Sequence, residues 1–297
     1  MKKIALVFRI NVDVESIIKE LMNNFAKSCY FYQFDIDEEL EPCILQNKDA
    51  CESAIRITDL QKDQRVTHVQ PDYILVFGGD GTILRAMHFT LEMNAPVLGF
   101  NMGKLGFLTD GNIEDLIPSL NNLLKGKYQK EKRMLLDVSV YRNRVKIVDM
   151  PALNDAVIYK GELSKLITIR LFSNKRYVYK ARCDGIIIST PTGSTAYSMS
   201  SGGPIISPDM EAMVVNSLSP HVLSIRPMVF NAENTLQFKL EEPHSSTVLQ
   251  VDGINIVQLQ SKDKIIIKRS NKKMSFIKLS HKTFYQILRK KLNMGKI

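Results

Sequence analysis

The stretch Gly78-Gly79-Asp80-Gly81-Thr82 carries the residue types best suited to chemistry on a phosphate group, and it directly follows the apolar run Tyr73–Phe77. That run predicts a buried strand ending at the glycines. Glycines let backbone N–H groups approach an anion closely, and a helix beginning near Thr82 would add its positive end. Asp80 is then suited to act as a general base toward a hydroxyl or to contact a metal ion. Taken alone, these residues also fit an ordinary Asp-Gly turn.

A second candidate loop, Thr190–Tyr197, follows the strand-like run Gly185–Ser189. It has four hydroxyl side chains, one glycine and one aromatic ring. The hydroxyls can donate hydrogen bonds to ribose and phosphate while the ring packs on a base or a sugar. A Ser/Thr turn that caps a helix is the alternative. Two such loops in one chain favour a nucleotide site over coincidence.

These stretches resemble the NAD kinase family, which phosphorylates the adenosine ribose of NAD to make NADP. The glycine-rich stretch is shared with diacylglycerol, sphingosine and phosphofructokinase-type enzymes, so alone it indicates a kinase of some kind. Thr190–Tyr197 followed by Gly202–Pro204 is far more specific. The matching stretches, in the family's order, are Gly78–Thr82, Gly99–Leu108, Asn154-Asp155, Asp184-Gly185, Thr190–Tyr197 and Gly202–Pro204.

The resemblance implies a role for each matched residue. Asp80 would be the catalytic base that accepts the proton of the ribose 2′-hydroxyl as it attacks the terminal phosphate of ATP or polyphosphate. Gly78, Gly79, Gly81 and Thr82 would form the phosphate loop, and a divalent cation, with Mg²⁺ expected, would assist without a dedicated protein site. NAD contacts are implied for Asp80, Gly81, Arg85, Asn154, Asp155, Lys165, Arg182, Asp184, Thr195, Ala196, Tyr197, Ser198 and Ser200.

From the residues alone, several of these positions have other readings. Arg85 fits a solvated helix residue equally well, and Asn154-Asp155 favours a turn. Arg182 and Asp184 would point to one face of a strand, where an ordinary ion pair is the alternative. The chain departs from the family at Ile254, where many relatives place Gln after Asp-Gly, so that one hydrogen bond is in doubt.

The first part of the chain alternates strand and helix signals. Such alternation predicts a parallel α/β sheet with ligands at the carboxyl ends of its strands, where Asp80 falls. We expect a polar connection around residues 44–66. The predicted elements are strands at 4–8, 30–34, 73–77 and 96–99 and helices near 14–26, from Thr82 and near 113–124.

From about Met134 the pattern changes to closely spaced β segments. The sequence therefore predicts an α/β, Rossmann-like N-terminal domain and a β-rich, β-sandwich-like C-terminal domain. We place the first domain at 1–130, completed by 282–297, and the NAD-binding β-rich domain at 131–281.

Composition excludes several other classes. No apolar run approaches the roughly 18 residues of a membrane-spanning helix, and Met1–Phe8 fits a first strand better than a signal peptide. The four cysteines, Cys29, Cys43, Cys51 and Cys183, have no metal-binding spacing, which favours reduced thiols in a cytoplasmic protein. Dispersed histidines and the lack of a Gly-x-Ser-x-Gly sequence disfavour a serine hydrolase. The family resemblance implies a homo-oligomer, a dimer or tetramer.

The excess of positive charge lies at the end of the chain. From Lys262 onward there are 12 Lys and Arg against one Asp, so this tail carries +11 while the remainder carries −2. A solvated face is one explanation, and a field that attracts the polyanionic phosphate donor is the other. Nucleic acid is not an expected partner, because no aromatic stacking pattern accompanies the charge.

Two other functions remain open from the sequence. A lipid kinase shares the Gly-Gly-Asp-Gly turn and a following β domain, but the loop Thr190–Tyr197 disfavours it. A non-catalytic dinucleotide-binding or regulatory protein is disfavoured by the presence of Asp80.

Overall fold

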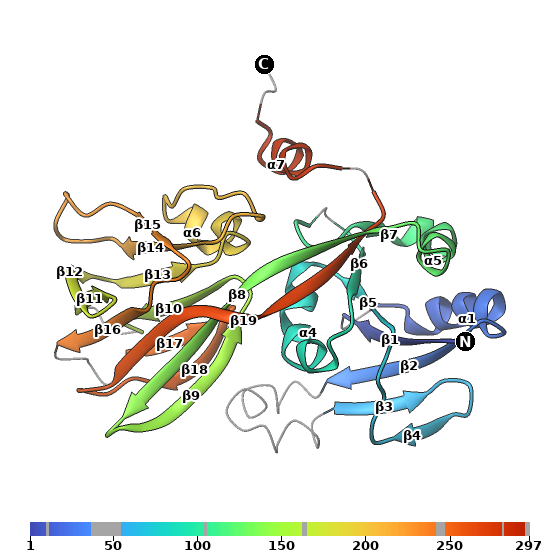
Figure 1. Ribbon diagram of the computed structural model, residues 1–297. Helices are drawn as coiled ribbons and strands as arrows, with labels where there is room; N and C mark the ends of the chain where they lie inside the picture. Colours follow the sequence, from blue (N-terminus) through green and yellow to red (C-terminus); the bar gives the residue numbers. More distant parts are fainter. Residues whose placement is uncertain are drawn as a thin grey trace. The chain divides into compact units, whose positions relative to one another are not determined.

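The computed structural model describes residues 1–9, 12–36, 55–103, 106–161, 165–241, 247–280 and 282–294 (Figure 1). It divides into two compact units, Met1–Lys132 with Met274–Ile297 (unit 1) and Arg133–Lys273 (unit 2). The limits that we expect from the sequence, 1–130 with 282–297 and 131–281, remain predictions of domain boundaries. Cys43, Cys51, His244 and His281 lie outside the described residues.

Unit 1 is an α/β unit whose sheet has a parallel centre. The strand order β6-β5-β1-β2 is parallel throughout, and β3 and β4 continue it antiparallel at one edge. Its elements are β1 (Lys2–Phe8), α1 (Val14–Phe25), β2 (Cys29–Ile36), β3 (Ile55–Asp59), β4 (Gln64–Val66), β5 (Tyr73–Gly78), α4 (Asp80–Met93), β6 (Val97–Asn101), β7 (Gly111–Asn112), the 3-10 helix η1 (Ile113–Asp115), α5 (Leu116–Leu124) and α7 (Phe284–Leu292).

The apolar runs that predicted strands form the core of unit 1. β5 and the centre of β1 are buried, and Phe77 stacks on both Phe8 and Phe100 at centroid distances of 5.0 and 5.1 Å. Helix α1 begins where the Asp13 side chain accepts the N–H of Ser16, as N-cap residues commonly do. The carboxyl ends of β5 and β6 therefore extend from strands that are packed in the core of unit 1.

One sequence prediction about unit 1 is wrong. The expected polar connection at 44–66 contains β3 and β4, while its residues 44–54 lie outside the described part of the chain. Both strands are short; β3 pairs with β2, and β4 pairs with β3 at the sheet edge, so strand pairing determines the structure here more than intrinsic propensity does. A smaller difference concerns α4, which begins at Asp80 instead of near Thr82.

Unit 2 contains two antiparallel sheets. One has the order β15-β14-β13-β10-β17-β18, and the other joins β12, β11, β16 and β19, with β8 attached to β19 and β9 attached to β8. Strands β8 and β19 continue from one unit into the other. The elements are β8 (Gln129–Arg142), β9 (Val145–Ala152), β10 (Asp155–Tyr159), β11 (Ile167–Ser173), β12 (Arg176–Cys183), β13 (Gly185–Ser189), η2 (Gly193–Thr195), α6 (Tyr197–Ser200), β14 (Ala212–Leu218), β15 (Met228–Asn231), β16 (Leu236–Glu241), β17 (Val248–Val251), β18 (Ile254–Gln258) and β19 (Lys264–Lys278).

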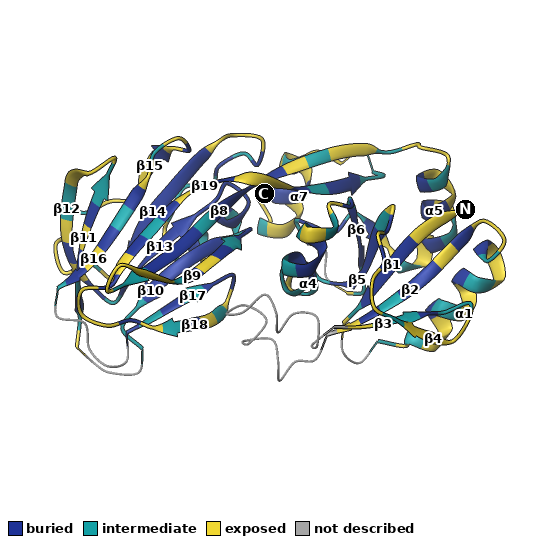
Figure 2. Ribbon diagram, turned by 60° about the horizontal axis from the view of Figure 1, so that its bottom comes forward, coloured by how far each residue is buried: buried dark blue, intermediate teal, exposed yellow. Residues whose placement is uncertain are grey.

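The two sheets of unit 2 pack against each other. Tyr179 of β12 and Ser217 of β14 are linked by a 3.3 Å hydrogen bond between their hydroxyls, which joins one sheet to the other. Every residue of β13 is buried, which requires cover on both faces (Figure 2). The predicted fold class, α/β followed by a β-sandwich-like part, is confirmed.

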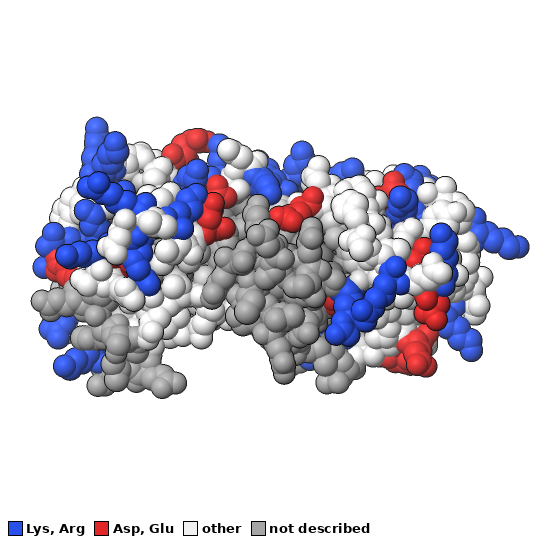
Figure 3. Space-filling model, turned by 90° about the horizontal axis from the view of Figure 1, so that it is seen from below, with Lys and Arg blue, Asp and Glu red and all other residues white. Residues whose placement is uncertain are grey.

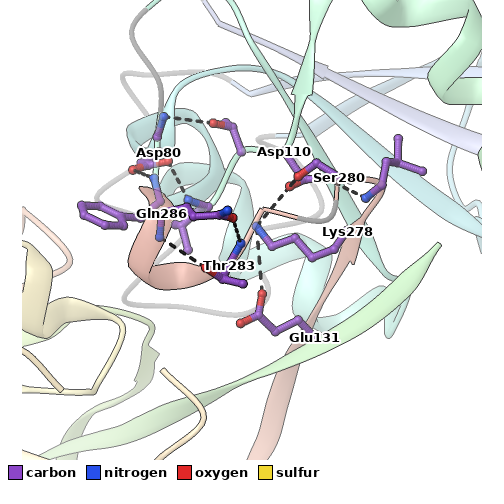
Figure 4. Close-up of polar contacts among 12 residues, drawn as sticks. Asp80, Asp110, Glu131, Lys278, Ser280, Thr283 and Gln286 are labelled. Carbon is purple, nitrogen blue, oxygen red and sulfur yellow. Dashed lines mark hydrogen bonds and ion pairs between the residues drawn. The ribbon is translucent and has the colours of Figure 1, made fainter. Parts of the chain in front are cut away.

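The C-terminal helix α7 is tied to the rest of unit 1 by Asp110 (Figure 4). Its carboxylate, 2% exposed, accepts the N–H groups of Leu279 and Ser280 at 2.6 and 2.7 Å and the Ser280 hydroxyl at 2.7 Å. Lys278 lies 3.7 Å from the same carboxylate and 4.0 Å from Glu131. Helix α7 then begins with a reciprocal capping box between Thr283 and Gln286.

Asp110→Ala should therefore destabilise unit 1 strongly. The substitution leaves two backbone N–H groups without their acceptor and the buried Lys278 with a weaker partner, which costs on the order of 3 kcal/mol. Urea unfolding measures the loss. Glu114→Ala, at an exposed position nearby in the sequence, is the control and should change the unfolding free energy by less than about 0.5 kcal/mol. Equal losses for both variants would show that Asp110 does not anchor the C-terminal segment.

Candidate functional site

The Asp80 turn occupies the end of β5 and the first turn of α4. Gly79 is the cap residue, and its carbonyl accepts the N–H groups of Thr82 and Ile83. A Cβ built on Gly79 or Gly81 would meet no atom within 4 Å, so the backbone here is open to an approaching group. The first N–H groups of a helix have no acceptor within the helix and carry its positive end. This turn is therefore suited to an anion.

Gly78 has a packing role in this turn. A Cβ at Gly78 would lie 2.2 Å from the Thr82 hydroxyl, so a side chain there would push α4 away from the strand. Thr82 itself is half-buried. Of the predicted phosphate loop, Gly79 and Gly81 face open space, whereas Gly78 and Thr82 hold the turn together.

The Asp80 carboxylate is held by the loop at residues 106–108. Oδ2 accepts the N–H of Phe107 at 2.8 Å, and Oδ1 accepts the N–H of Leu108 at 3.0 Å. A Cβ at Gly106 would lie 2.0 Å from Oδ1, so only glycine allows this approach. The side chain of Asp80 is still 27% exposed, which leaves the carboxylate reachable for a substrate hydroxyl.

Lys291 of α7 completes the surroundings of Asp80. Its Nζ lies 3.7 Å from Asp80 Oδ2 and 4.3 Å from the centroid of the Phe107 ring. Sequence reasoning assigned this lysine only to the basic tail. Lys291 and Asp80 are more than 200 positions apart in the sequence. No local residue pattern indicates a contact between such distant positions. We call Asp80, Gly106, Phe107, Leu108 and Lys291 the Asp80 cluster.

In unit 2 the Asn154-Asp155 turn meets the loop Thr190–Tyr197. Asp155 begins β10 and pairs with Ser189, the last residue of β13, so the loop starts beside the turn. The carbonyl of Asn154 accepts the N–H of Thr190 at 2.8 Å. A Cβ at Gly193 would lie 2.1 Å from that carbonyl oxygen, so the glycine allows the two segments to touch.

Three hydroxyls of this loop donate hydrogen bonds to backbone carbonyl groups. Thr190 donates to the carbonyl of Leu153 at 2.5 Å, and Ser194 donates to that of Pro191 at 2.6 Å. Thr195 donates to the carbonyl of Thr192 at 3.1 Å. Neither η2 nor α6 has a side-chain cap hydrogen bond, so these bonds are not the helix caps of the alternative interpretation. They fix the backbone of the loop, and the predicted contacts of the loop with a nucleotide stay a prediction.

Asp252 is a residue of this region whose role sequence reasoning missed. Its carboxylate accepts the N–H groups of Leu153, Asn154 and Asp155 at 2.8, 2.7 and 3.1 Å. Its left-handed backbone, with φ of 48° at Asp252 followed by 89° at Gly253, turns the chain between β17 and β18. The Asp-Gly pair after an apolar strand was the available signal. We call Asn154, Asp155, Asp252 and the loop Thr190–Tyr197 the Asp155 cluster.

The two carboxyl groups of the Asp155 cluster, those of Asp155 and Asp252, are both buried. Burial raises the pKa of Asp155 to about 7, with the nearby charge of Asp252 as the second cause. Burial also raises the pKa of Asp252 to about 6, although its three backbone N–H bonds oppose this rise. Asp252 therefore has the lower pKa of the two and is the carboxyl group that ionises first, whereas Asp155 keeps its proton to higher pH.

The aromatic end of the loop is its most exposed part. Tyr197, the first residue of α6, is 46% exposed, and Ser200 is also exposed. Thr195 and Ala196 are half-buried, whereas Ser198 is fully buried. Tyr197 is therefore the side chain of this loop best placed to pack on a base or a sugar.

The remaining predicted residues lie outside the two clusters or at their margins. Arg85 is half-buried in α4, and Lys165 is exposed before β11. Arg182 is exposed near the end of β12, which stops at Cys183, and Asp184 lies between β12 and β13, so a common strand face for the two side chains stays a prediction. Asp184 pairs with Lys160 at 2.6 Å.

Several positive charges of the basic tail are paired with carboxylates. Arg269 pairs with Glu211 and Glu233, and Lys273 pairs with Glu211, all within unit 2. Lys278 is buried against Asp110, and Lys291 pairs with Asp80 in unit 1. On the face shown in Figure 3, positive and negative side chains are interspersed. Much of the predicted attraction to polyanions is therefore offset locally.

Other candidate sites find little support in the described residues. Within them, no group of three or more His, Cys, Asp or Glu side chains is arranged to hold a metal ion. Cys29 and Cys183 are buried free thiols whose pKa values burial raises to about 11 and about 12. In the same part of the chain, no helix is long and apolar enough to cross a membrane.

Ile254 stands where many relatives place Gln, and the residue after it, Asn255, makes a side-chain hydrogen bond of its own. Asn255 accepts a 3.0 Å hydrogen bond from the Tyr159 hydroxyl.

The fold and the two clusters define a nucleotide-dependent phosphotransferase, with a glycine-rich anion turn on an α/β unit and a recognition loop on a β-sandwich. Comparisons give the particular family. The sequence model of the ATP-NAD kinase N-terminal domain matches residues 9–128, and that of the C-terminal domain matches residues 153–279. An NAD kinase of Caldanaerobacter subterraneus is 32% identical over 98% of this chain and 99% of its own. The chain belongs to the NAD kinase family of enzymes.

Solved structures agree on the fold. A yeast NADH kinase complexed with NADH superposes with a TM-score of 0.81 at 19% identity, covering 100% of this chain and 89% of its own. An NAD kinase from Archaeoglobus fulgidus in complex with ATP gives a TM-score of 0.72 at 23% identity, covering 98% of both chains. The family resemblance is confirmed, and the lipid-kinase and non-catalytic alternatives are not supported.

The buried carboxyl pair predicts an unusual pH dependence. Between about pH 4 and 7 the unfolded chain releases the Asp155 proton while the folded chain keeps it, so this group makes folding less favourable as pH rises. Asp155→Asn removes the penalty. Relative to wild type, the variant should gain about 3 kcal/mol of stability between pH 4.5 and pH 8, since the full rise in the pKa corresponds to about 4 kcal/mol and about 1 kcal/mol of it is already present at pH 4.5. Urea unfolding across this range measures the difference, and a difference that does not vary with pH would contradict the assignment.

Proposed function

We propose that this NAD kinase transfers the terminal phosphate of ATP to the 2′-hydroxyl of the adenosine ribose of NAD, giving NADP and ADP. The observation that carries the proposal is the Asp80 carboxylate, fixed by two backbone N–H groups at the open N-terminus of α4. Phosphoryl transfer depends mainly on alignment and charge neutralisation, which a rigid turn of this kind supplies.

In this mechanism Asp80 is the general base. Each of its oxygens accepts one backbone N–H and keeps a further lone pair, so the carboxylate can also accept the proton of the ribose hydroxyl. The hydroxyl oxygen then forms the bond to the terminal phosphorus, and the bond from that phosphorus to the bridging oxygen of ADP breaks. Gly79 and Gly81 leave the backbone N–H groups open to phosphate oxygens.

The Asp155 cluster supplies recognition of the dinucleotide. We assign NAD contacts to Asn154 and Asp155, whose backbone Asp252 holds in place, and to Tyr197 with its exposed ring. A neutral Asp155 is able to donate a hydrogen bond, which suits an acceptor on a base or carboxamide. The contacts predicted for Gly81, Arg85, Lys165, Arg182, Asp184, Thr195, Ala196, Ser198 and Ser200 are retained as part of the proposal.

A divalent cation fits this site as a companion of the phosphate donor. Mg²⁺ keeps most of its waters and binds through one or two carboxylates together with substrate phosphates, so a protein cage is not required. Asp80, with a partly exposed carboxylate beside the anion turn, is the residue able to contribute a ligand. The cation would neutralise charge on the transferring phosphoryl group. Polyphosphate as an alternative donor, a homo-oligomeric state and a cytoplasmic location complete the proposal.

Asp80→Asn should lower turnover by roughly 10²-fold or more while leaving NAD affinity within a few-fold, since an amide is nearly isosteric but cannot accept the proton. The assay incubates the purified protein with NAD, ATP and Mg²⁺ and detects NADP enzymatically, and calorimetry gives the NAD affinity. Asp115→Asn, an exposed control on the same unit, should keep wild-type turnover. Near wild-type turnover of Asp80→Asn would show that Asp80 is not the base.

Asp155→Ala and Tyr197→Ala should each raise the KM for NAD more than the KM for ATP. Loss of a base- or ribose-stacking ring costs on the order of 1 kcal/mol, which corresponds to about a fivefold rise. Tyr177→Ala is the control, because this tyrosine is also exposed, 60%, but lies on β12 away from the cluster. A selective loss of ATP affinity in Tyr197→Ala would reassign the loop to the phosphate donor.

A further inference from the structure

Four basic side chains form a row across one sheet of unit 2. Arg170 of β11 is directly opposite Lys180 of β12 on one side and Lys239 of β16 on the other, and Lys239 is opposite Lys264 of β19. All four residues are exposed. Since neighbouring strands lie about 4.8 Å apart, the row spans roughly 14 Å. We call Lys180, Arg170, Lys239 and Lys264 the basic row.

The basic row lies on the outer face of its sheet. Side chains alternate between the two faces of a strand, and the chain neighbours of the row, among them Ile169, Leu171, Phe238 and Ile265, are buried. These buried neighbours therefore point to the interior of unit 2, and the row points to solvent. The Asp155 cluster belongs to the other sheet, at the ends of β10, β13 and β17. The row is therefore a surface separate from that cluster.

The charges of the basic row are only partly compensated. Like charges directly opposite each other on a sheet are destabilising. Glu241 offsets one end of the row, because its carboxylate pairs with Arg170 and lies 3.4 Å from Lys180 Nζ. Within the described residues, Lys239 and Lys264 have no carboxylate partner. An anion bound along the row would therefore relieve a repulsion that the fold leaves in place.

Protection of a sheet edge explains only one residue of the row. Lysines on edge strands prevent pairing with other chains, and Lys180 lies on β12, the last strand of the sheet. Arg170, Lys239 and Lys264 lie on β11, β16 and β19, each of which has a strand on both sides. Their charge does not serve to protect an edge.

We propose that the basic row is a docking surface for a linear inorganic polyphosphate chain, which lies across the four strands. The argument is charge complementarity. Every phosphate unit of such a chain carries negative charge, and no bulky group separates the charges, so the chain can follow evenly spaced cations. Docking involves no phosphoryl transfer, so this inference goes beyond the proposed function and does not require it.

Other polyanions match the row less well. Single-stranded nucleic acid needs aromatic ring faces for its bases, and Lys239 Nζ lies over the ring of Phe172, 5.2 Å from its centroid. An extended acidic peptide points its side chains alternately to two sides. Only every second carboxylate of the peptide could therefore face the row.

The experiment measures binding of labelled long-chain inorganic polyphosphate to the full-length protein by fluorescence anisotropy over a series of salt concentrations. It compares two variants that lose the same charge at exposed lysines. The row variant is Lys180→Gln with Lys239→Gln and Lys264→Gln, and the control variant, in unit 1, is Lys19→Gln with Lys27→Gln and Lys125→Gln.

The row variant should bind polyphosphate about tenfold or more weakly than wild type at about 0.1 M salt, and the control variant within about twofold of wild type. The slope of log affinity against log salt should fall by about 2 in the row variant only, because three contacts with a linear polyanion are lost. Lys180→Arg with Lys239→Arg and Lys264→Arg should bind as wild type does, because the charge is kept.

Two further measurements exclude misfolding and damage to the catalytic site. Without polyphosphate, the melting temperature of the row variant should equal or exceed that of wild type, because the repulsion across the strands is removed. NADP formation from NAD and ATP should be the same in wild type and both variants, since the row lies outside the Asp80 and Asp155 clusters.

Three results would overturn the inference. The first is wild-type binding of polyphosphate by the row variant. The second is an equal loss in the row and control variants, which would mean that only net charge matters. The third is binding of single-stranded poly(U) RNA or of polyglutamate through the same lysines as tightly as polyphosphate, which would assign the surface to nucleic acid or to an acidic protein.

Discussion

A partly exposed carboxylate at the start of a helix has to be held by donors without being closed to its substrate, and much of unit 1 serves that requirement. Asp80 receives its two hydrogen bonds from the backbone of Phe107 and Leu108. Backbone donors are fixed by the fold and do not need to be ordered during the reaction. Gly106 permits the approach, Gly78 permits the tight turn into α4, and β5 and β6 deliver both segments to one edge of the sheet.

Unit 2 uses the same device in a buried setting. Asp252 accepts three backbone N–H groups and thereby fixes the Asn154-Asp155 turn. The second carboxyl group, Asp155, then lies in a buried position beside a charge, so its pKa rises to about 7. A carboxyl group that resists ionisation in the folded chain reduces the stability of the fold at neutral pH.

The net charge of the basic C-terminal tail, residues 262–297, overstates its attraction for anions, because several of its charges form ion pairs. Its +11 suggests a field that attracts polyanions. In the structure, Arg269 and Lys273 share Glu211, Lys278 is buried, and Lys291 faces Asp80. The charge at Lys291 therefore acts mainly on a neighbouring carboxylate, at a distance where salt screens it less than it screens a remote charge.

The sequence by itself determined the fold class, the family and the identity of most local elements, because apolar periodicity, glycine positions and the loop Thr190–Tyr197 are local signals. The sequence also predicted that Asp80 directly follows the end of a buried strand. The tertiary structure decided which donors hold that carboxylate and that Asp252 supports Asp155. It also decided that the Thr190 hydroxyl bonds to the carbonyl of Leu153 and the Ser194 hydroxyl to that of Pro191, and that β3 and β4 extend the sheet beyond β2. These features depend on contacts between distant segments, such as Asp80 with Lys291, whose formation follows from packing of the whole unit and leaves no trace in local residue patterns.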